Sequence, residues 1–402
     1  MPSAIVTGAT GITGSAIVHH LLKDGSYDKI YSFSRGNPGY QDPKVQHVAL
    51  DLQSSAQNMA MVFQGVSAEC IFFCAYLASD DQVQLSRVNE RLLFNFLEAL
   101  ELNGSAKKSS VSSSLAASSE NNAGRVSWPP IFYHPQQRVL ATAAKKGGWE
   151  WVATLPEDVL GYARGNFMNE ATALGLYCVV SKALPGSELP YIGSQANYFS
   201  FNCWTSANLH AKFCLWAAVA PGAGNQIFNV INGDTESFQN LWPRMASRFG
   251  CNIPDPMFPN GGIPNTKGFK GYESSTIKLK NKPPLKASAA ALGLSSDPVS
   301  NDSPTLFLQV DPEKWAKRED VNQAWGKLRE RYNLDQHAWE KATWNFLTMT
   351  LGRDWSCVGS MSKARKLGWT GYADTWDELE DTFKILESEG VLPPLDQLKR
   401  DF

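Results

Sequence analysis

The segment Ala4–Gly14, with the sequence AIVTGATGITG, constrains the fold of this chain more than any other. Its first residues, Ala4–Thr7, form a short apolar run rich in β-branched side chains, which predicts a strand. Glycines follow at positions 8, 11 and 14, and an apolar pattern of helical period then continues to Leu22. A strand that enters a helix through such a turn is typical of dinucleotide-binding folds, because the turn presents backbone N–H groups and a helix N-terminus to a pyrophosphate.

Each glycine of this turn has a predicted structural task. Gly8 lets the chain turn sharply, Gly11 lets the backbone approach the pyrophosphate, and Gly14 lets the helix pack closely against the strand. Thr10 and Ile12 complete the turn, and we predict that they contact the cofactor together with the glycines. The competing interpretation is an ordinary strand–helix turn without a ligand.

Strands and helices alternate through the first third of the chain, which predicts an α/β fold with a Rossmann-type, doubly wound parallel sheet. Strands are expected at 29–34, 45–49, 70–75, 149–155 and 226–231, and helices at 53–63, 81–102, 133–146, 167–182, 206–219 and 237–249. Three further helices, at 312–332, 336–351 and 375–389, predict a smaller and mainly helical C-terminal substrate domain. We therefore expect a dinucleotide-binding domain over 1–165, to which 205–235 returns, and a substrate-binding cap over 166–204 and 236–402 with a long loop at 254–305.

The segment 104–127 interrupts this alternation. It is rich in Ser and Ala, contains few large apolar residues and shows no period, which is typical of a linker. A fifth strand would be expected here and none is visible, so we predict that a central strand is lost or poorly replaced. Two explanations stay open: a true replacement in the protein, which would alter the active site, or a shifted reading frame or missed intron in the coding sequence.

Composition excludes several classes of function. The net charge of −2 gives no electrostatic reason to expect a nucleic-acid partner, and no apolar run is long enough to span a bilayer. The chain enters its first strand directly, so no leader peptide is expected. The seven cysteines lack CxxC pairs and the six histidines lack metal spacing, which indicates a cytoplasmic protein without a metal site. The oligomeric state stays open, a homodimer included.

The end of the second predicted strand indicates which dinucleotide is bound. Ser34 and Arg35 occupy the position that meets the adenosine ribose in this fold. An acidic residue there would accept a hydrogen bond from the 2′-hydroxyl, whereas an arginine can bind a 2′-phosphate and stack on adenine. The sequence therefore favours NADPH over NADH, and the alternative is a solvated surface arginine.

Two other strand ends carry candidate cofactor contacts. Asp51 can accept a hydrogen bond from the adenine amino group while Leu52 packs on the ring; the alternative for Asp51 is the N-cap of the next helix. Cys74, Ala75 and Tyr76 end the fourth predicted strand at the edge that faces the ligand crevice. We expect backbone contacts from these three residues and a packing role for the Cys74 thiol.

Three further segments resemble the extended short-chain dehydrogenase/reductases, and within them the group that includes progesterone 5β-reductase and iridoid synthase. The stretch Ile131–Gln137, IFYHPQQ, looks like the segment of that group that holds the catalytic tyrosine. The stretches 154–169, TLPEDVLGYARGNFMN, and 206–234, which ends in Asn-Gly-Asp, look like its next two segments. The chain is also similar to fungal members of the NAD-dependent epimerase/dehydratase type.

This resemblance implies a reaction and a site. The group reduces a C=C bond conjugated to a carbonyl, with NADPH as hydride donor and a tyrosine hydroxyl on the carbonyl oxygen where negative charge develops. Tyr133 is the residue that matches this tyrosine. Pro156 and Val159 match the backbone that flanks the nicotinamide. The implied substrate is a small and largely apolar enone or ketone, with a role in secondary metabolism.

The lysine that assists the tyrosine in this family has no counterpart in this chain. The family places it after the fifth strand, where this chain has its Ser-rich segment. The lysines at 107–108 and 145–146 lack the right context, and Gln137, four residues after Tyr133, carries no charge. Two alternatives therefore stay open: an NADP-binding protein with an impaired site, and an enzyme of nucleotide-sugar epimerase or dehydratase type.

Overall fold

A computed structural model of the chain describes residues 2–79, 81–104, 133–165, 169–259, 271–279 and 305–402, and the backbone of 110–114. The chain forms two units, each interrupted in sequence. Unit 1 contains Met1–Glu157, Trp204–Gly233 and Gly359–Ala373. Unit 2 contains Asp158–Cys203, Asp234–Val358 and Asp374–Phe402.

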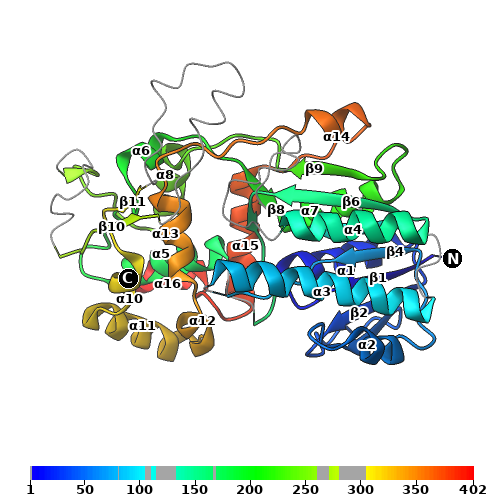
Figure 1. Ribbon diagram of the computed structural model, residues 1–402. Coiled ribbons are helices and arrows are strands. Elements are labelled where there is room, and N and C mark those ends of the chain that lie inside the picture. Colours follow the sequence, from blue (N-terminus) through cyan, green and yellow to red (C-terminus); the bar gives the residue numbers. More distant parts are fainter. Residues whose placement is uncertain are drawn as a thin grey trace, which may run out of the picture. The chain divides into compact units, whose positions relative to one another are not determined.

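Unit 1 is built on a parallel seven-stranded sheet (Figure 1). Its strands lie in the order β3-β2-β1-β4-β5-β6-β9, and every neighbouring pair is parallel. The strand order reverses at β1, which lies between β2 and β4, and such a reversal creates a ligand crevice in open α/β sheets. The predicted Rossmann-type fold is confirmed. The strands are β1 (Ser3–Thr7), β2 (Lys29–Ser34), β3 (Val45–Ala49), β4 (Cys70–Phe73), β5 (Ser110–Ser114), β6 (Glu150–Pro156) and β9 (Gln226–Val230).

The Ser-rich segment does contain a strand, so of the two predicted alternatives a lost central strand is wrong, and a serine-rich strand takes its place. β5 pairs with β4 from Cys70 opposite Ser110 to Phe73 opposite Ser113. On its other side it pairs with β6 in a continuous parallel register. Backbone hydrogen bonds to two apolar neighbours recruit this strand although its sequence shows no apolar pattern. The rest of 104–127 lies outside the described residues.

Helices cover both faces of this sheet. α1 (Ile12–Asp24) packs against α7 (Ala207–Val219), which also contacts β5 and β6. α3 (Gln82–Asn103) packs against both α2 (Ala56–Val62) and α4 (Tyr133–Gly147). A strand directs alternate side chains to opposite faces, so each buried strand contributes side chains to the hydrophobic core on either face of the sheet.

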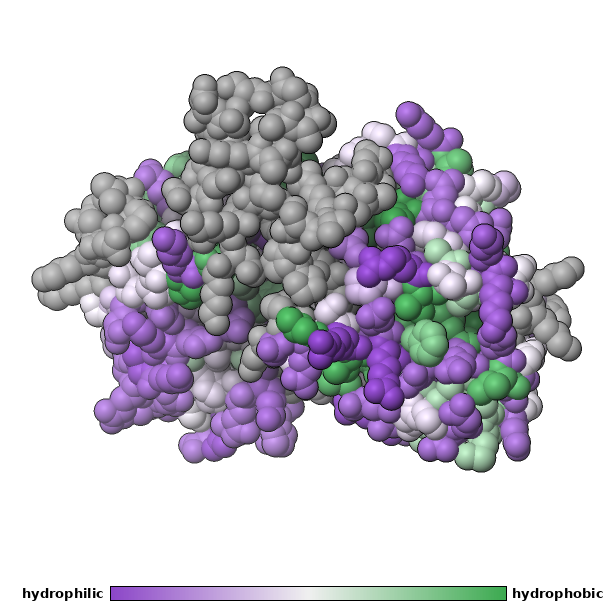
Figure 2. Space-filling model, in the orientation of Figure 1, coloured by the Kyte–Doolittle hydropathy of each residue, from purple (hydrophilic) through white to green (hydrophobic). Residues whose placement is uncertain are grey.

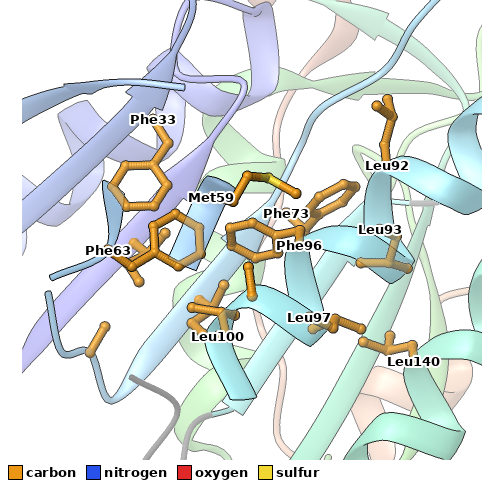
Figure 3. Packing of buried hydrophobic residues seen from close by; sticks show 14 of the residues in the cluster. Phe33, Met59, Phe63, Phe73, Leu92, Leu93, Phe96, Leu97, Leu100 and Leu140 are labelled. Atoms are coloured by element: carbon orange, nitrogen blue, oxygen red, sulfur yellow. The ribbon is translucent and has the colours of Figure 1, made fainter. Parts of the chain in front are cut away.

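One of these cores is rich in phenylalanine (Figure 3). The rings of Phe33 from β2 and Phe63 after α2 stack with centroids 5.3 Å apart. Phe96 of α3 packs edge-on against Phe63 at 5.7 Å and lies 5.5 Å from Phe73 of β4. These four rings pack α2 and α3 onto one face of the sheet.

The segment Gly359–Ala373, which the sequence assigned to the cap, clusters with unit 1. It contains the short helix α14 (Ser362–Lys366), which lies against β9. The Lys363 ammonium donates a hydrogen bond to the carbonyl of Ile227 at 2.7 Å, and the Asn229 amide donates to Ser360 at 3.1 Å. These bonds attach a segment that is distant in sequence to β9, the outer strand of the sheet.

Unit 2 is mainly helical. Its central helix, α5 (Glu170–Ala183), is buried along almost its whole length and contacts α8 (Phe238–Phe249), α11 (Glu319–Tyr332), α13 (Trp344–Gly352) and α15 (Thr375–Ser388).

Two of the predicted C-terminal helices are each divided in the structure. The helix predicted over 312–332 is two helices, α10 (Pro312–Ala316) and α11, and the helix predicted over 336–351 is α12 (Gln336–Glu340) and α13. Neither break contains Gly or Pro, so the pattern carried no signal for it. The remaining elements are β7 (Asp158–Leu160), α6 (Gln195–Phe199), β10 (Ser275–Lys278), β11 (Thr305–Leu308) and α16 (Leu395–Asp401).

The surface mixes polar and apolar side chains. On the face shown in Figure 2, hydrophobic residues form small spots between hydrophilic ones. Across the described helices, none combines the length and the hydropathy needed to cross a membrane.

Candidate active site

The sheet register places the predicted cofactor residues at one edge. Thr7 of β1 lies opposite Phe33 of β2 and opposite Phe73 of β4. The residues that follow, Gly8, Ser34 and Cys74, therefore lie side by side at the carboxyl edge of the sheet. Ligands of open parallel sheets bind at this edge, beside the point where the strand order reverses.

Two positions accept only glycine, one in the turn between β1 and α1 and one in the first turn of α1. Gly8 has φ +64°, and a Cβ there would lie 2.8 Å from the carbonyl oxygen of Cys74. A Cβ on Gly14 would collide with the carbonyl oxygen of Gly8. These contacts match the sharp turn and the close helix–strand packing predicted for the two glycines.

The start of α1 is open to an anion. Its N-cap is Gly11, which has no side chain to cap the first N–H groups of the helix. The Gly11 N–H itself donates to the carbonyl of Gly8 at 2.8 Å and closes the turn. Thr10 is exposed and Ile12 is half-buried at the first position of the helix. Uncapped N–H groups at a helix N-terminus suit a phosphate group.

Ser34 and Arg35 lie where the sequence placed them, at the end of β2. Ser34 is buried, and its hydroxyl donates to the carbonyl of Gly36 at 2.8 Å. Arg35 is exposed. In the part of the chain that the structure describes, its guanidinium forms no ion pair and no hydrogen bond.

Asp51 and Leu52 follow β3, as expected, but Asp51 does not cap a helix. Its carboxylate accepts a hydrogen bond from the Gln53 N–H at 3.0 Å and closes a local turn. The N-cap of α2 is Ser55, whose hydroxyl accepts from the Asn58 N–H at 3.2 Å. The alternative of a helix N-cap at Asp51 is therefore wrong. Leu52 packs against the phenylalanine core.

The end of β4 is held by β1. The Cys74 N–H donates to the hydroxyl of Thr7 at 3.1 Å. Burial raises the pKa of the Cys74 thiol well above its usual range, so the group stays protonated and cannot serve as a thiolate nucleophile at neutral pH. Ala75 is half-buried and Tyr76 is exposed, so the chain emerges from the core over these residues.

A buried amide pair joins this loop to the helix that carries Tyr133. The Asn89 side chain on α3 accepts from the Leu77 N–H at 2.9 Å and donates to the Leu77 carbonyl at 2.8 Å. Gln136, in the first turn of α4, donates to the Asn89 carbonyl at 2.9 Å. Sequence reasoning missed both amides, although a polar Asn89 on the apolar face of a helix was a usable signal.

Tyr133 is the first residue of α4 and is half-buried against the phenylalanine core. Gln137 lies one turn further along the helix. Lys145 and Lys146 lie in its last turn, and Lys146 pairs with Glu101 at 2.7 Å. At a rise of 1.5 Å per residue they are about 18 Å from Tyr133 along the helix axis. Lys107 and Lys108 lie outside the described residues.

The end of β6 is anchored within unit 1. Pro156 is the last residue of β6, and the following Glu157 N–H donates to the hydroxyl of Thr205 at 2.9 Å. That hydroxyl donates in turn to the carbonyl of Val230 on β9 at 2.6 Å. Val159 is half-buried in β7 of unit 2. Thr205, in the short strand β8 (Trp204–Ser206), is a second positioning group that the sequence did not reveal.

The sheet, its reversal at β1 and the glycine turn together define a Rossmann-type dinucleotide-binding fold. Residues 4–143 match the NAD dependent epimerase/dehydratase family, and residues 124–272 match the PRISE-like Rossmann-fold domain. The chain is 30% identical over 410 residues to an uncharacterized protein of Schizosaccharomyces pombe, covering 97% of this chain and 98% of that protein. The chain belongs to the extended short-chain dehydrogenase/reductase family, in its epimerase/dehydratase branch.

Other relatives carry names that describe an activity. The short chain dehydrogenase gsfE of Penicillium aethiopicum is 25% identical over 413 residues, covering 97% of this chain and 99% of that protein. An (S)-8-oxocitronellyl enol synthase of Nepeta cataria is 24% identical over 279 residues, covering 61% of this chain and 68% of that enzyme. Among solved structures, the Bordetella bronchiseptica enzyme WbmF in complex with NAD+ has a TM-score of 0.57 at 14% identity, covering 100% of this chain and 96% of WbmF. That likeness supports the fold.

Proposed function

We propose that the protein is an NADPH-dependent reductase of a small, largely apolar substrate in which a C=C bond is conjugated to a carbonyl, or of a related ketone. The glycine turn, the ends of β2 and β3 and the loop after β4 would hold the dinucleotide. The bound cofactor would supply the hydride. The named dehydrogenase and enol synthase relatives support an oxidoreductase of small molecules.

Arg35 would determine which of the two cofactors is preferred. It follows the strand next to the glycine turn, is exposed, and has no partner among the described side chains that would neutralise it. A guanidinium forms two parallel hydrogen bonds to a phosphate, and charge-assisted bonds of this kind contribute about 1.5 to 3 kcal/mol. The 2′-phosphate of NADPH is the group that such a side chain would bind and that NADH lacks.

Tyr133 would stabilise the charge that develops on the substrate carbonyl. Its hydroxyl would donate a hydrogen bond to that oxygen as hydride adds to the β-carbon. Asn89 and Gln136 would keep the loop after β4 and the first turn of α4 in a fixed relation. The family's assisting lysine has no counterpart in the sequence, and Lys145 and Lys146 lie in the last turn of α4. We therefore propose that the tyrosine acts as a neutral hydrogen-bond donor.

The cofactor proposal is tested with pairs of ligands that differ in the 2′-phosphate of the adenosine. Calorimetry would compare adenosine 2′,5′-bisphosphate with adenosine 5′-monophosphate, and NADPH with NADH, on the wild-type protein and on Arg35→Gln. We expect the wild type to prefer each 2′-phosphorylated ligand, and Arg35→Gln to lose about 10- to 100-fold in affinity for these ligands alone. Equal affinity of the wild type for both members of each pair would refute the proposal.

The activity is tested by absorbance of NADPH in the presence of a panel of enones, enals and ketones. Oxidation that falls strongly in Tyr133→Phe supports the reductase. Binding of NADPH without turnover, unchanged by Tyr133→Phe, would identify a dinucleotide-binding protein without this activity, which the missing lysine favours. Tight binding of NAD without net consumption would indicate epimerase or dehydratase chemistry instead.

A further inference from the structure

The loop after β2 is tied to the glycine turn by one phenol. The Tyr40 hydroxyl donates a hydrogen bond to the carbonyl of Ala9 at 3.1 Å. Burial raises the pKa of Tyr40 to about 12, so the hydroxyl keeps its proton at neutral pH and remains a donor. The ring also packs edge-on against His19 of α1, with centroids 5.6 Å apart. Tyr40 thus connects the loop after β2 with the glycine turn and with α1.

Apart from this bond and the packing of the Tyr40 ring on His19, the loop 35–41 is held by short-range hydrogen bonds. The Ser34 hydroxyl donates to Gly36, the Asn37 side chain accepts from the Gly39 N–H at 2.8 Å, and the Gln41 side chain donates to Gly39 at 3.0 Å. Among hydrogen bonds between described residues, only the one from Ser34, at the end of β2, and the one from Tyr40 join 35–41 to another element, and only the bond from Tyr40 reaches the glycine turn. The backbone around Arg35 is otherwise exposed and restrained only by local turns.

The glycine turn has further restraints of its own. The Gly11 N–H bonds to Gly8 at 2.8 Å, the Ser15 N–H bonds to Gly11 at 2.8 Å, and Gly8 lies tightly against Cys74. Loss of the Tyr40 bond should therefore loosen the loop that bears Arg35 and leave the turn in place.

We infer that Tyr40 is a specificity-determining residue, which holds the loop 35–41 so that Arg35 is preorganised for the 2′-phosphate of NADPH. This inference rests on the proposed function of Arg35 and extends it to a residue that would not touch the phosphate itself. A preorganised cation binds its ligand more tightly because less conformational entropy is lost on binding. The ligand class is a nucleotide that carries a phosphate on the 2′-oxygen of its adenosine.

The test uses Tyr40→Phe, which deletes one hydroxyl and keeps the ring on His19. Tyr27→Phe is the control, because it also removes one phenol hydroxyl from unit 1, at a buried position where the hydroxyl lies 3.6 Å from the Cys70 sulfur. We expect Tyr40→Phe to weaken adenosine 2′,5′-bisphosphate and NADPH by about three- to tenfold, as the net loss of one hydrogen bond predicts. Adenosine 5′-monophosphate and NADH should bind as to the wild type, which also shows that the variant is folded.

A double-mutant cycle separates a positioning role from a general structural one. If Tyr40 acts through Arg35, Tyr40→Phe should cost nothing further in an Arg35→Gln background. Equal weakening of all four ligands, additive losses in the double variant, or unchanged affinity for the 2′-phosphorylated ligands in Tyr40→Phe would each overturn the inference. Failure of the proposed function looks different, because the wild type itself would then show no preference for a 2′-phosphate.

Discussion

A buried histidine makes the stability of this protein depend on pH. His210 of α7 has no exposed surface, and its Nε2 atom lies 2.9 Å from the hydroxyl of Thr154 on β6. Its Nδ1 atom is buried without a hydrogen-bond partner. Protonation would place a charge and a second N–H donor in an apolar environment that offers this donor no acceptor. Burial accordingly lowers the pKa of His210 from 6.5 to about 4.

The sign follows from comparing the two states. The folded pKa lies below the unfolded one, so between these values the unfolded chain binds a proton that the folded chain rejects. The contribution of His210 is complete above pH 6.5 and is lost as the pH falls toward 4. Proton linkage gives a loss of about 1 kcal/mol at about pH 5.5 and of about 2 to 3 kcal/mol at about pH 4.5.

Urea unfolding at several pH values measures this loss. Tryptophan fluorescence reports on the region, because Phe213 on α7 and the nearby Trp216 and Trp369 pack with centroids about 5 Å apart. His210→Gln keeps a polar side chain for Thr154 but cannot be protonated in this range. We expect it to be less stable than the wild type near neutral pH and to lose about 2 to 3 kcal/mol less on acidification to about pH 4.5.

A matched substitution isolates the buried ring from the other histidines. His337→Gln removes an exposed imidazole from unit 2, and its acid profile should follow that of the wild type. If His210→Gln and the wild type lose stability in parallel between about pH 7.5 and about pH 4.5, the argument from burial is refuted.

Three further substitutions test the packing. Gly14→Ala places a Cβ against the carbonyl oxygen of Gly8 and should destabilise unit 1 by about 1 to 3 kcal/mol and weaken dinucleotide binding in calorimetry, whereas Gly326→Ala, in open space on α11, should not. Phe96→Ala empties the centre of the phenylalanine core and should cost about 3 to 5 kcal/mol in urea unfolding. Arg248→Met removes the buried cation that pairs with two carboxylates of α15 at 2.6 and 2.7 Å, and should lower the unfolding free energy by about 3 kcal/mol; an unchanged midpoint would show that the pairs contribute little.

The strands and helices of unit 1 were largely predictable because each carries a local signal. The apolar run before Gly8 and the glycines after it specify a strand, a turn and a helix. β5 carries no such signal: SVSSS has a single apolar residue, and its neighbours β4 and β6 provide the hydrogen bonds that make it a strand. A central position in a sheet can outweigh a weak intrinsic preference.

The positions of the candidate site residues were predictable where the chain leaves a strand. Gly8, Arg35 and Cys74 follow strands directly, and parallel strands end at a common edge. The partners of the groups that hold these positions were not predictable. Asn89 stood out as a polar residue on an apolar helix face, but nothing in the sequence indicated that its amide bonds to Leu77, or that Thr205 bonds to Glu157.

The sequence by itself determined the class of fold and the strand ends that form the candidate site, because glycine turns and apolar periods act over a few residues. The tertiary structure alone decided that a serine-rich strand completes the sheet, that 359–373 joins unit 1, and that a phenol at position 40 reaches the carbonyl of Ala9. These features depend on which surfaces meet after folding. Contacts between residues far apart in the chain leave no local pattern that could be recognised beforehand.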